Sequence, residues 1–220
     1  MGRVGRYFFV VLFCLILLSP SMVSAASSLA VQGFYEAAFR GEYGDTQRSV
    51  TIRWAKPITI CLKGDYIRGD VATVAALLYD LSANVQNLPQ LSLTTKPEGA
   101  NVIMSFVPYE KMNEAVTGYE DGNVGFVWVN YDKYVVNSAE IAISTTNTSQ
   151  KSRSAVIREE IVNMLGLLDD ISCTRKSIIC QDGKAVSDLS SIDYEMLNIL
   201  YGPLMLPGTT MEQAGKILGK

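Results

Sequence analysis

The sequence of 220 residues predicts one α+β domain that follows a short leader. Segments rich in β-branched and aromatic residues recur through the middle of the chain, which is typical of strands. Apolar residues at helical spacing flank these segments, which is typical of helices that pack on a sheet. The last part of the chain carries helical patterns only. The expected architecture is therefore a mixed, twisted sheet of about five strands with a long helix and a helical C-terminal part.

The first 25 residues have the three-part pattern of a cleaved secretory signal. Two arginines precede an apolar run over residues 8–18, and small residues lead up to Ala25. The apolar run is shorter than the roughly 20 residues that a bilayer-spanning helix needs. We therefore expect residues 1–25 to be removed and residues 26–220 to form one periplasmic or secreted domain without a membrane span.

Charge and cysteine content limit the possible partners and fix the expected redox chemistry. Residues 26–220 carry 17 basic and 22 acidic side chains, and no basic patch alternates with aromatic residues. Nucleic acid is therefore not an expected partner. Cys173 and Cys180 lie close together in the sequence and are expected to form a disulfide in an oxidising compartment. Cys61 lies in an apolar segment, so we expect a free and buried thiol.

Five segments are predicted to be strands because they are extended, apolar and bounded by turn residues. A proline precedes the first segment, where it is tolerated because a strand's first residue need not donate to the ladder. The five segments are 58–63, 91–96, 100–107, 125–130 and 139–145.

Helices are predicted before, between and after these strands. A short N-terminal helix is expected within residues 31–45, ending near Gly41. Asp70 is expected to cap a longer helix whose apolar residues continue to position 85 at helical spacing.

Two helices are predicted near the C-terminus from their capping residues. Ser190 stands at the expected start of the first. Thr209 and Glu212 have the spacing of a capping box for the second.

The stretch REEIVNMLGLLDD, residues 158–170, predicts an amphipathic helix. Glu159, Asn163 and Gly166 fall on one narrow polar side. An ordinary helix with a solvated polar ridge explains this pattern, and Gly166 would then be the left-handed residue that ends it. The opposite side is apolar and comprises Ile157, Ile161, Met164, Leu165 and Leu168.

Several kinds of active site are excluded by the residues themselves. The chain contains no histidine, so it holds no Ser-His or Cys-His nucleophile system. Glu159 and Glu160 are neighbours, about 100° apart on a helix, and cannot act as the opposed carboxylates of a glycosidase. No glycine-rich phosphate-binding fingerprint is present.

The element order and the spacing E-E-x-x-N-x-x-G-x-x-D resemble the zincin metalloprotease fold, whose helix reads H-E-x-x-H-x-x-G-x-x-[H/D]. In this register Glu159 and Asn163 stand at the first two ligand positions. Glu160 stands at the general-base position, Gly166 at the turn glycine and Asp169 at the third ligand position. The resemblance implies that the segment around 125–130 borders the substrate cleft.

Most of the mature chain also resembles a bacterial secreted family of unknown function that is itself zincin-like. Arg158 belongs to one of its motifs, R-E-E-x-x-[QN]-x-x-G-L. Arg158 could be solvated, or it could pair with an acidic residue in a polar network. The matching segments are RWAKPI (53–58), REEIVNMLGL (158–167), SII (177–179), LSSID (189–193) and LY (200–201).

The resemblance leaves two classes of function open. Glu159, Asn163 and Asp169 offer only oxygen ligands, which suit Mg²⁺, Ca²⁺ or Mn²⁺ better than Zn²⁺, so no zinc or other cofactor is expected. The first class is a non-catalytic protein that binds a protein, peptide or glycan partner in the cell envelope. The alternative is an atypical metal-dependent hydrolase or peptidase with Glu160 as general base.

Overall fold

The computed structural model describes residues 26–40, 49–172, 176–180 and 187–220. The expected leader, Cys173 and the end of the expected first helix lie outside these residues. Within the described part, no helix is both long and apolar enough to cross a membrane.

The described strands form one six-stranded mixed sheet in which only β5 runs antiparallel to its neighbour. β1 pairs with the beginning of β6, and β4 pairs with the rest of β6 on the same side. β2 lies between β4 and β3. β5 follows β6 along its other side. The strands are β1 (Arg53–Trp54), β2 (Ile58–Gly64), β3 (Leu91–Thr94), β4 (Val102–Val107), β5 (Gly125–Asp132) and β6 (Val135–Ser144).

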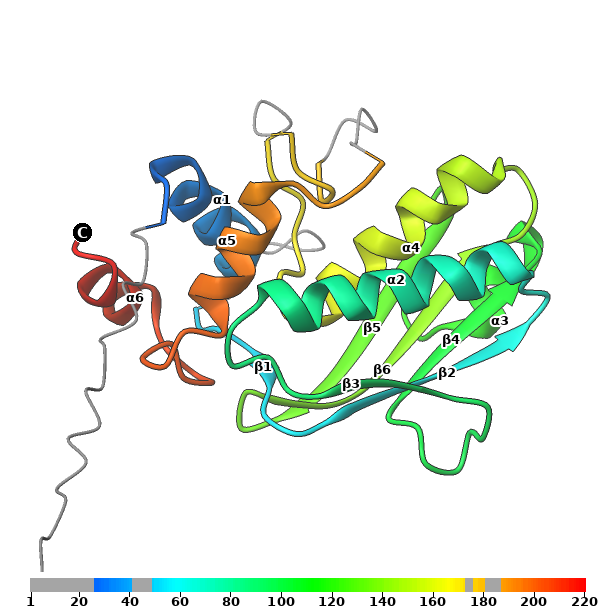
Figure 1. The fold of residues 1–220 in the computed structure, drawn as a ribbon, viewed down its shortest axis with the longest axis horizontal. Coiled ribbons are helices and arrows are strands. Elements are labelled where there is room, and N and C mark those ends of the chain that lie inside the picture. The colour runs from blue at the N-terminus through cyan, green and yellow to red at the C-terminus, as the bar shows by residue number, and fades with distance from the viewer. Residues whose placement is uncertain (1–25, 41–48, 173–175, 181–186) are drawn as a thin grey trace, which may run out of the picture.

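The helices lie mainly on one face of the sheet and at one end of it (Figure 1). α2 and α4 run side by side over the sheet, and α1 packs against α5 beyond β1. The helices are α1 (Ser28–Phe39), α2 (Arg68–Asn84), α3 (Met112–Ala115), α4 (Gln150–Met164), α5 (Ser191–Leu200) and α6 (Met211–Ile217), with a 3-10 turn over Tyr109–Lys111.

The two faces of the sheet differ because side chains alternate along each strand. In β4, Val102, Met104 and Phe106 are buried beneath the helices, whereas the residues between them are only half-buried. A smaller apolar cluster around Met112 and Phe126 covers part of the opposite side. We call the rest of that side the open face.

The predicted strands and the buried thiol are confirmed. All five segments form strands, although β6 begins at Val135 and the short β1 was not anticipated. Cys61 is free and buried in β2. The expected first helix is present, but it begins earlier than predicted, at Ser28 after the N-cap Ser27, and ends at Phe39, two residues before Gly41.

Two predicted caps were wrong by a few residues. α2 begins at Arg68, and Asp70 lies inside the first turn, where its carboxylate accepts the Ile67 N–H at 2.9 Å. An acidic residue at this third position can reach back to the chain before the helix. Thr209 likewise does not cap α6.

The capping box of α6 is formed one residue later than expected. The hydroxyl of Thr210 accepts from the Gln213 N–H at 3.2 Å, and the Gln213 side chain accepts from Thr210 N at 2.8 Å. A Gln at the third helical position serves as well as a Glu, which is why the neighbouring pair was mistaken for the box. The predicted cap at Ser190 is confirmed.

Candidate functional site

The helix that carries the predicted site is α4, and it ends where Gly166 turns the chain. Gly166 has a positive φ of 115°, as expected of the glycine that ends the helix. A Cβ at this position would lie only 2.3 Å from the Ile52 carbonyl oxygen. Both the backbone conformation and the close approach of residue 52 therefore require glycine.

Two distant side chains satisfy the last carbonyl groups of α4. Trp54 Nε1 donates to the Met164 carbonyl and the Tyr201 hydroxyl donates to the Leu165 carbonyl, both at 2.8 Å and both buried. Carbonyls at a helix end lack intrahelical partners, so these bonds supply what the helix cannot. Burial raises the pKa of Tyr201, which keeps its hydroxyl protonated as the donor.

Arg53 performs the same task for the end of α5. One guanidinium nitrogen donates to the carbonyls of Leu200 and Met205 at 2.7 and 2.8 Å. The guanidinium also lies over the Tyr201 ring, 4.9 Å from its centroid. Arg53, Trp54 and Tyr201 therefore join the ends of α4 and α5 through β1.

The polar ridge of α4 is only partly solvated, which corrects the simpler expectation: Asn163 is buried, with an exposed fraction of 9%, whereas Glu159 is half-buried. Glu160 is 7% exposed, and β5 packs against α4. Asp169 is also buried, and its N–H donates to the Ala37 carbonyl at 3.2 Å. Among the described residues, the Asn163 Oδ1 atom has no hydrogen-bond partner.

The start of β5 lies directly against Glu160. A Cβ on Gly125 would lie 2.6 Å from Glu160 Oε1 and 2.2 Å from Val156 Cγ1. Glycine therefore lets the strand approach the helix closely enough to bury the Glu160 carboxylate. The first residue of the segment 125–130 therefore lies against α4.

The carboxylates at and after the end of α4 are not grouped as metal ligands among the residues that the structure describes. In the described part of the chain, no three His, Cys, Asp or Glu side chains are grouped so that they could hold an ion. Glu159 is half-buried, and Asp169 follows the turn at Gly166. Burial raises the pKa of the neighbouring Asp170 carboxyl.

Arg158 lies away from this site. Its guanidinium donates to the Ser154 carbonyl at 2.8 Å and pairs with Asp188 at 3.0 Å. The Asp188 side chain is exposed, and such surface pairs contribute little to stability. Of the two readings of Arg158, the structure favours an ion pair on the surface.

A second set of polar residues, which the sequence did not reveal as a unit, joins α4 to α2. Arg153 Nε donates to Asp70 Oδ1 at 3.0 Å, and both side chains are buried. Gln150 donates to the same oxygen at 2.9 Å, and the hydroxyls of Thr73 and Ser154 lie 3.0 Å apart. The spacing of the polar residues at positions 150, 153 and 154 indicates that they share one side of a helix. Nothing in the sequence indicates that this side contacts Asp70.

Asp193 organises the segment that precedes α5. Its carboxylate accepts from the Ser177 hydroxyl at 2.5 Å and from the Ile178 N–H at 3.2 Å. It also accepts the Ser190 N–H at 2.7 Å as part of the helix cap. One buried carboxylate therefore ties residues 177–178 to the start of the helix.

β5 borders the sheet and leaves one long edge open. Ser144 N donates to the Val124 carbonyl at 2.8 Å, which fixes the hydrogen-bonding phase of the β5–β6 pair. In an antiparallel pair these bonds alternate, so Gly125, Val127 and Val129 direct their N–H and carbonyl groups away from β6. Among the described residues, only β6 pairs with β5.

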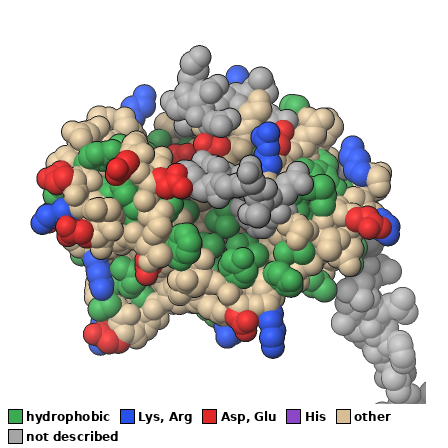
Figure 2. All heavy atoms as spheres, turned by 180° about the vertical axis from the view of Figure 1, so that it is seen from behind, with side chains coloured by type: hydrophobic (Ala, Val, Ile, Leu, Met, Phe, Trp, Pro, Cys, Tyr) green, Lys and Arg blue, Asp and Glu red, His purple; other side chains and the backbone are tan. Residues whose placement is uncertain are grey.

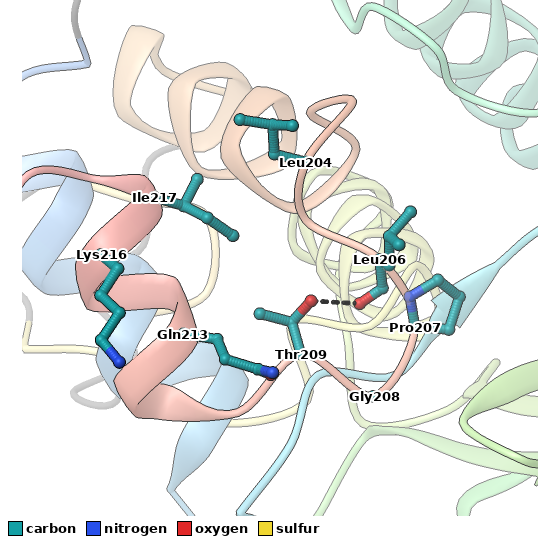
Figure 3. A pocket seen from close by; sticks show the side chains of 8 residues that line it. All are labelled: Leu204, Leu206, Pro207, Gly208, Thr209, Gln213, Lys216 and Ile217. Carbon is teal, nitrogen blue, oxygen red and sulfur yellow. Dashed lines mark hydrogen bonds between the residues drawn. The ribbon is translucent and has the colours of Figure 1, made fainter.

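A surface hollow lies at the C-terminal end of the molecule, apart from α4 (Figure 3). Its volume is about 450 Å³, and its polar side chains already have partners within the chain. Thr209 donates to the Leu206 carbonyl at 2.7 Å, and Lys216 pairs with Glu212 at 2.6 Å. None of the predicted site residues lines it; the lining is Leu204, Leu206, Pro207, Gly208, Thr209, Gln213, Lys216 and Ile217.

A family model for proteins of unknown function, DUF2927, matches residues 27–220. The chain belongs to the DUF2927 family. No curated protein matches the chain. Four residues of the segments that suggested a family make structural hydrogen bonds in this DUF2927 protein: Arg53, Trp54 and Tyr201 at the ends of α4 and α5, and Asp193 before α5.

Two solved structures of myroilysin are similar to this DUF2927 protein. The first has a TM-score of 0.42 and 12% sequence identity, and the match covers 70% of this chain and 96% of that one. The second has a TM-score of 0.45 and 12% identity, and the match covers 81% of this chain and 94% of that one.

Proposed function

We propose that this protein is a zincin-like, non-catalytic binding protein of the cell envelope, which holds an extended polypeptide segment along β5. The observation that carries the proposal is the open edge of β5 beside the buried face of α4. Three residues of this edge direct backbone donors and acceptors outward. An added strand satisfies such groups directly, and side-chain contacts then select the partner.

Aromatic residues close to this edge support a role in recognition. Tyr131 and Tyr134 of the β5–β6 hairpin are exposed. Figure 2 shows the molecule from behind, with hydrophobic side chains gathered across the middle of that face. Exposed aromatic side chains near an unpaired strand are typical of an interaction surface.

The zincin-like part of the proposal rests on how α4 and β5 meet. The helix lies above the sheet, ends at Gly166 and presents Glu160 to the first residue of an antiparallel border strand. This arrangement agrees with the register in which Glu159 and Asn163 take the first two ligand positions. The leader-like residues 1–25 support a location outside the cytoplasm.

The donor set does not fit a catalytic zinc ion. Such sites normally use at least one histidine or cysteine among three protein ligands. Glu159, Asn163 and Asp169 supply oxygen alone, and the sequence has no histidine to replace them. We therefore assign Glu160 no role as a general base.

Blocking one outward N–H of β5 is expected to weaken peptide binding. Val127→Pro removes a donor that β6 does not use, whereas Val127→Ala keeps the donor and loses a similar amount of packing. Peptides selected from a random library on the wild-type protein should bind the proline variant about tenfold more weakly. The alanine variant should bind them nearly as well as the wild type.

Calorimetric titration of the selected peptides measures this difference, and circular dichroism checks that both variants are folded. Equal binding by the proline variant and the wild type would show that the open edge of β5 is not the binding site.

Glu160→Gln is expected to leave binding unchanged, because the substitution preserves shape and removes only the charge. Elemental analysis of protein purified without added metal should show no stoichiometric zinc. Stoichiometric zinc in the wild type, together with a hydrolytic activity that Glu160→Gln abolishes, would instead establish the hydrolase alternative.

A further inference from the structure

Trp128 lies on the open face of the sheet, on the side away from α2 and α4. The buried side chain of Phe126, two residues earlier on the same side of β5, belongs to the small cluster below the sheet. The Trp128 side chain itself is 40% exposed. The backbone N–H of Trp128 is directed toward β6. This residue therefore presents its indole ring to solvent, and not its backbone groups.

Two contacts fix the orientation of this exposed ring. The six-membered ring rests on Gly118, where a Cβ would lie 2.7 Å from Cζ3, and Gly118 has a positive φ of 69°. On its other side the indole Nε1 lies 3.3 Å from Asn130 Oδ1, to which it donates. The ring is thus held in place before any partner arrives, which lowers the entropy lost on binding.

Polar side chains of β5 and β6 lie next to Trp128 on the open face, and Ile103 of β4 follows Glu140 across the sheet. Glu140 lies opposite Trp128 in the β5–β6 register, and Ser138 lies opposite Asn130. Neighbouring strands are about 4.8 Å apart, so the side chains of Asn130, Ser138 and Glu140 lie close together next to the ring. Glu140 is anchored, because one of its oxygens accepts from the Thr117 N–H and hydroxyl at 2.9 and 2.8 Å.

The chemistry of this array selects among partners. Asn130 bonds to Trp128 and Ser138, and one Glu140 oxygen bonds to Thr117. A purely apolar partner would still strip water from the Ser138 hydroxyl and the Glu140 carboxylate without replacing it. An anionic polymer would meet the Glu140 carboxylate next to the ring. A neutral sugar chain carries C–H groups that fit the negative face of an aromatic ring, and hydroxyl groups that bond to the polar side chains around it.

We propose that the open face around Trp128 binds a neutral polysaccharide chain, with one sugar stacked on the indole ring and its neighbours bonded to Asn130, Ser138 and Glu140. This site uses side chains on the sheet face, whereas the peptide edge proposed above uses outward backbone groups. The two sites are therefore separable by mutation.

The two tryptophans of the chain make the proposal directly measurable. Trp54 is completely buried, whereas Trp128 is exposed, so acrylamide should quench mainly Trp128 fluorescence. Titration with cellotetraose and with chitotetraose is expected to protect that fluorescence with at least one of the two. An oligogalacturonate of similar length serves as the anionic control and should give no protection.

Variants locate the site by calorimetric titration. Trp128→Ala should bind the protective oligosaccharide about tenfold more weakly, and Trp128→Phe should retain part of the affinity. Tyr79→Ala, which removes an exposed aromatic side chain from α2, is the matched control and should bind normally. Val127→Pro should also bind the sugar normally, which separates this site from the β5 edge.

The proposal is overturned if neither neutral oligosaccharide protects Trp128 at millimolar concentration. It is also overturned if the anionic control protects equally well, or if Trp128→Ala binds as tightly as the wild type.

Discussion

Gly166→Ala is expected to destabilise the protein by about 3 kcal/mol or more. Two costs combine here. The φ of 115° is unfavourable for alanine, and the new Cβ would lie 2.3 Å from the Ile52 carbonyl oxygen. Relief of this contact would push β1 away from the end of α4. Unfolding by urea, followed by circular dichroism, measures the loss.

A second glycine separates the two costs. Gly122 has a similar φ of 105°, but a Cβ there would meet no atom within 4 Å. Gly122→Ala therefore reports the backbone cost alone, about 1 kcal/mol. Equal losses at Gly122 and Gly166 would contradict the close contact between α4 and residue 52.

Asp70→Ala is expected to destabilise the protein by about 3–5 kcal/mol, because it leaves Arg153 buried without its carboxylate partner. The ion pair is 3.0 Å long, and its side chains are 9% and 0% exposed. The same substitution also removes the acceptor for the Ile67 N–H at the start of α2. Chemical unfolding again provides the measurement.

An exposed ion pair provides the matched control for this prediction. Glu212→Ala breaks a contact of 2.6 Å to Lys216 on the surface of α6 and should cost less than about 0.5 kcal/mol. The double variant Asp70→Leu with Arg153→Met should recover part of the loss, because an apolar pair leaves no buried charge. A loss at Asp70 no larger than that at Glu212 would refute a stabilising role for the buried pair.

Local features of the fold were predictable from the sequence. Alternation and β-branched content located the strands of the sheet because these signals depend on neighbouring residues. The glycine that ends α4 was also predictable, since a left-handed residue commonly follows a helix. The cap at Asp70 was misplaced because the N-cap of α2 is the apolar Ile67, and Asp70 acts from the third helical position. The cap at Thr209 was misplaced because the neighbouring Thr210 has the same hydroxyl and serves instead.

The relations between distant residues were not predictable. Asp70 and Arg153 lie 83 residues apart, and each alone has the pattern of an ordinary polar residue on a helix. The burial of Glu160 depends on Gly125, a residue whose only sequence signal is the start of a strand. A helical wheel shows which residues share a side but not which element covers that side.

The contacts of Arg53 have a consequence for the order in which the chain folds. The carbonyls of Leu200 and Met205 lie 147 and 152 residues further along the sequence. Contacts across such separations close large loops, whose entropy must be overcome before the contacts stabilise the structure. β1 therefore reaches its final partners only when nearly the whole chain has left the ribosome. A chain that ends before residue 205 would therefore lack part of the join that Arg53 makes at the end of α5.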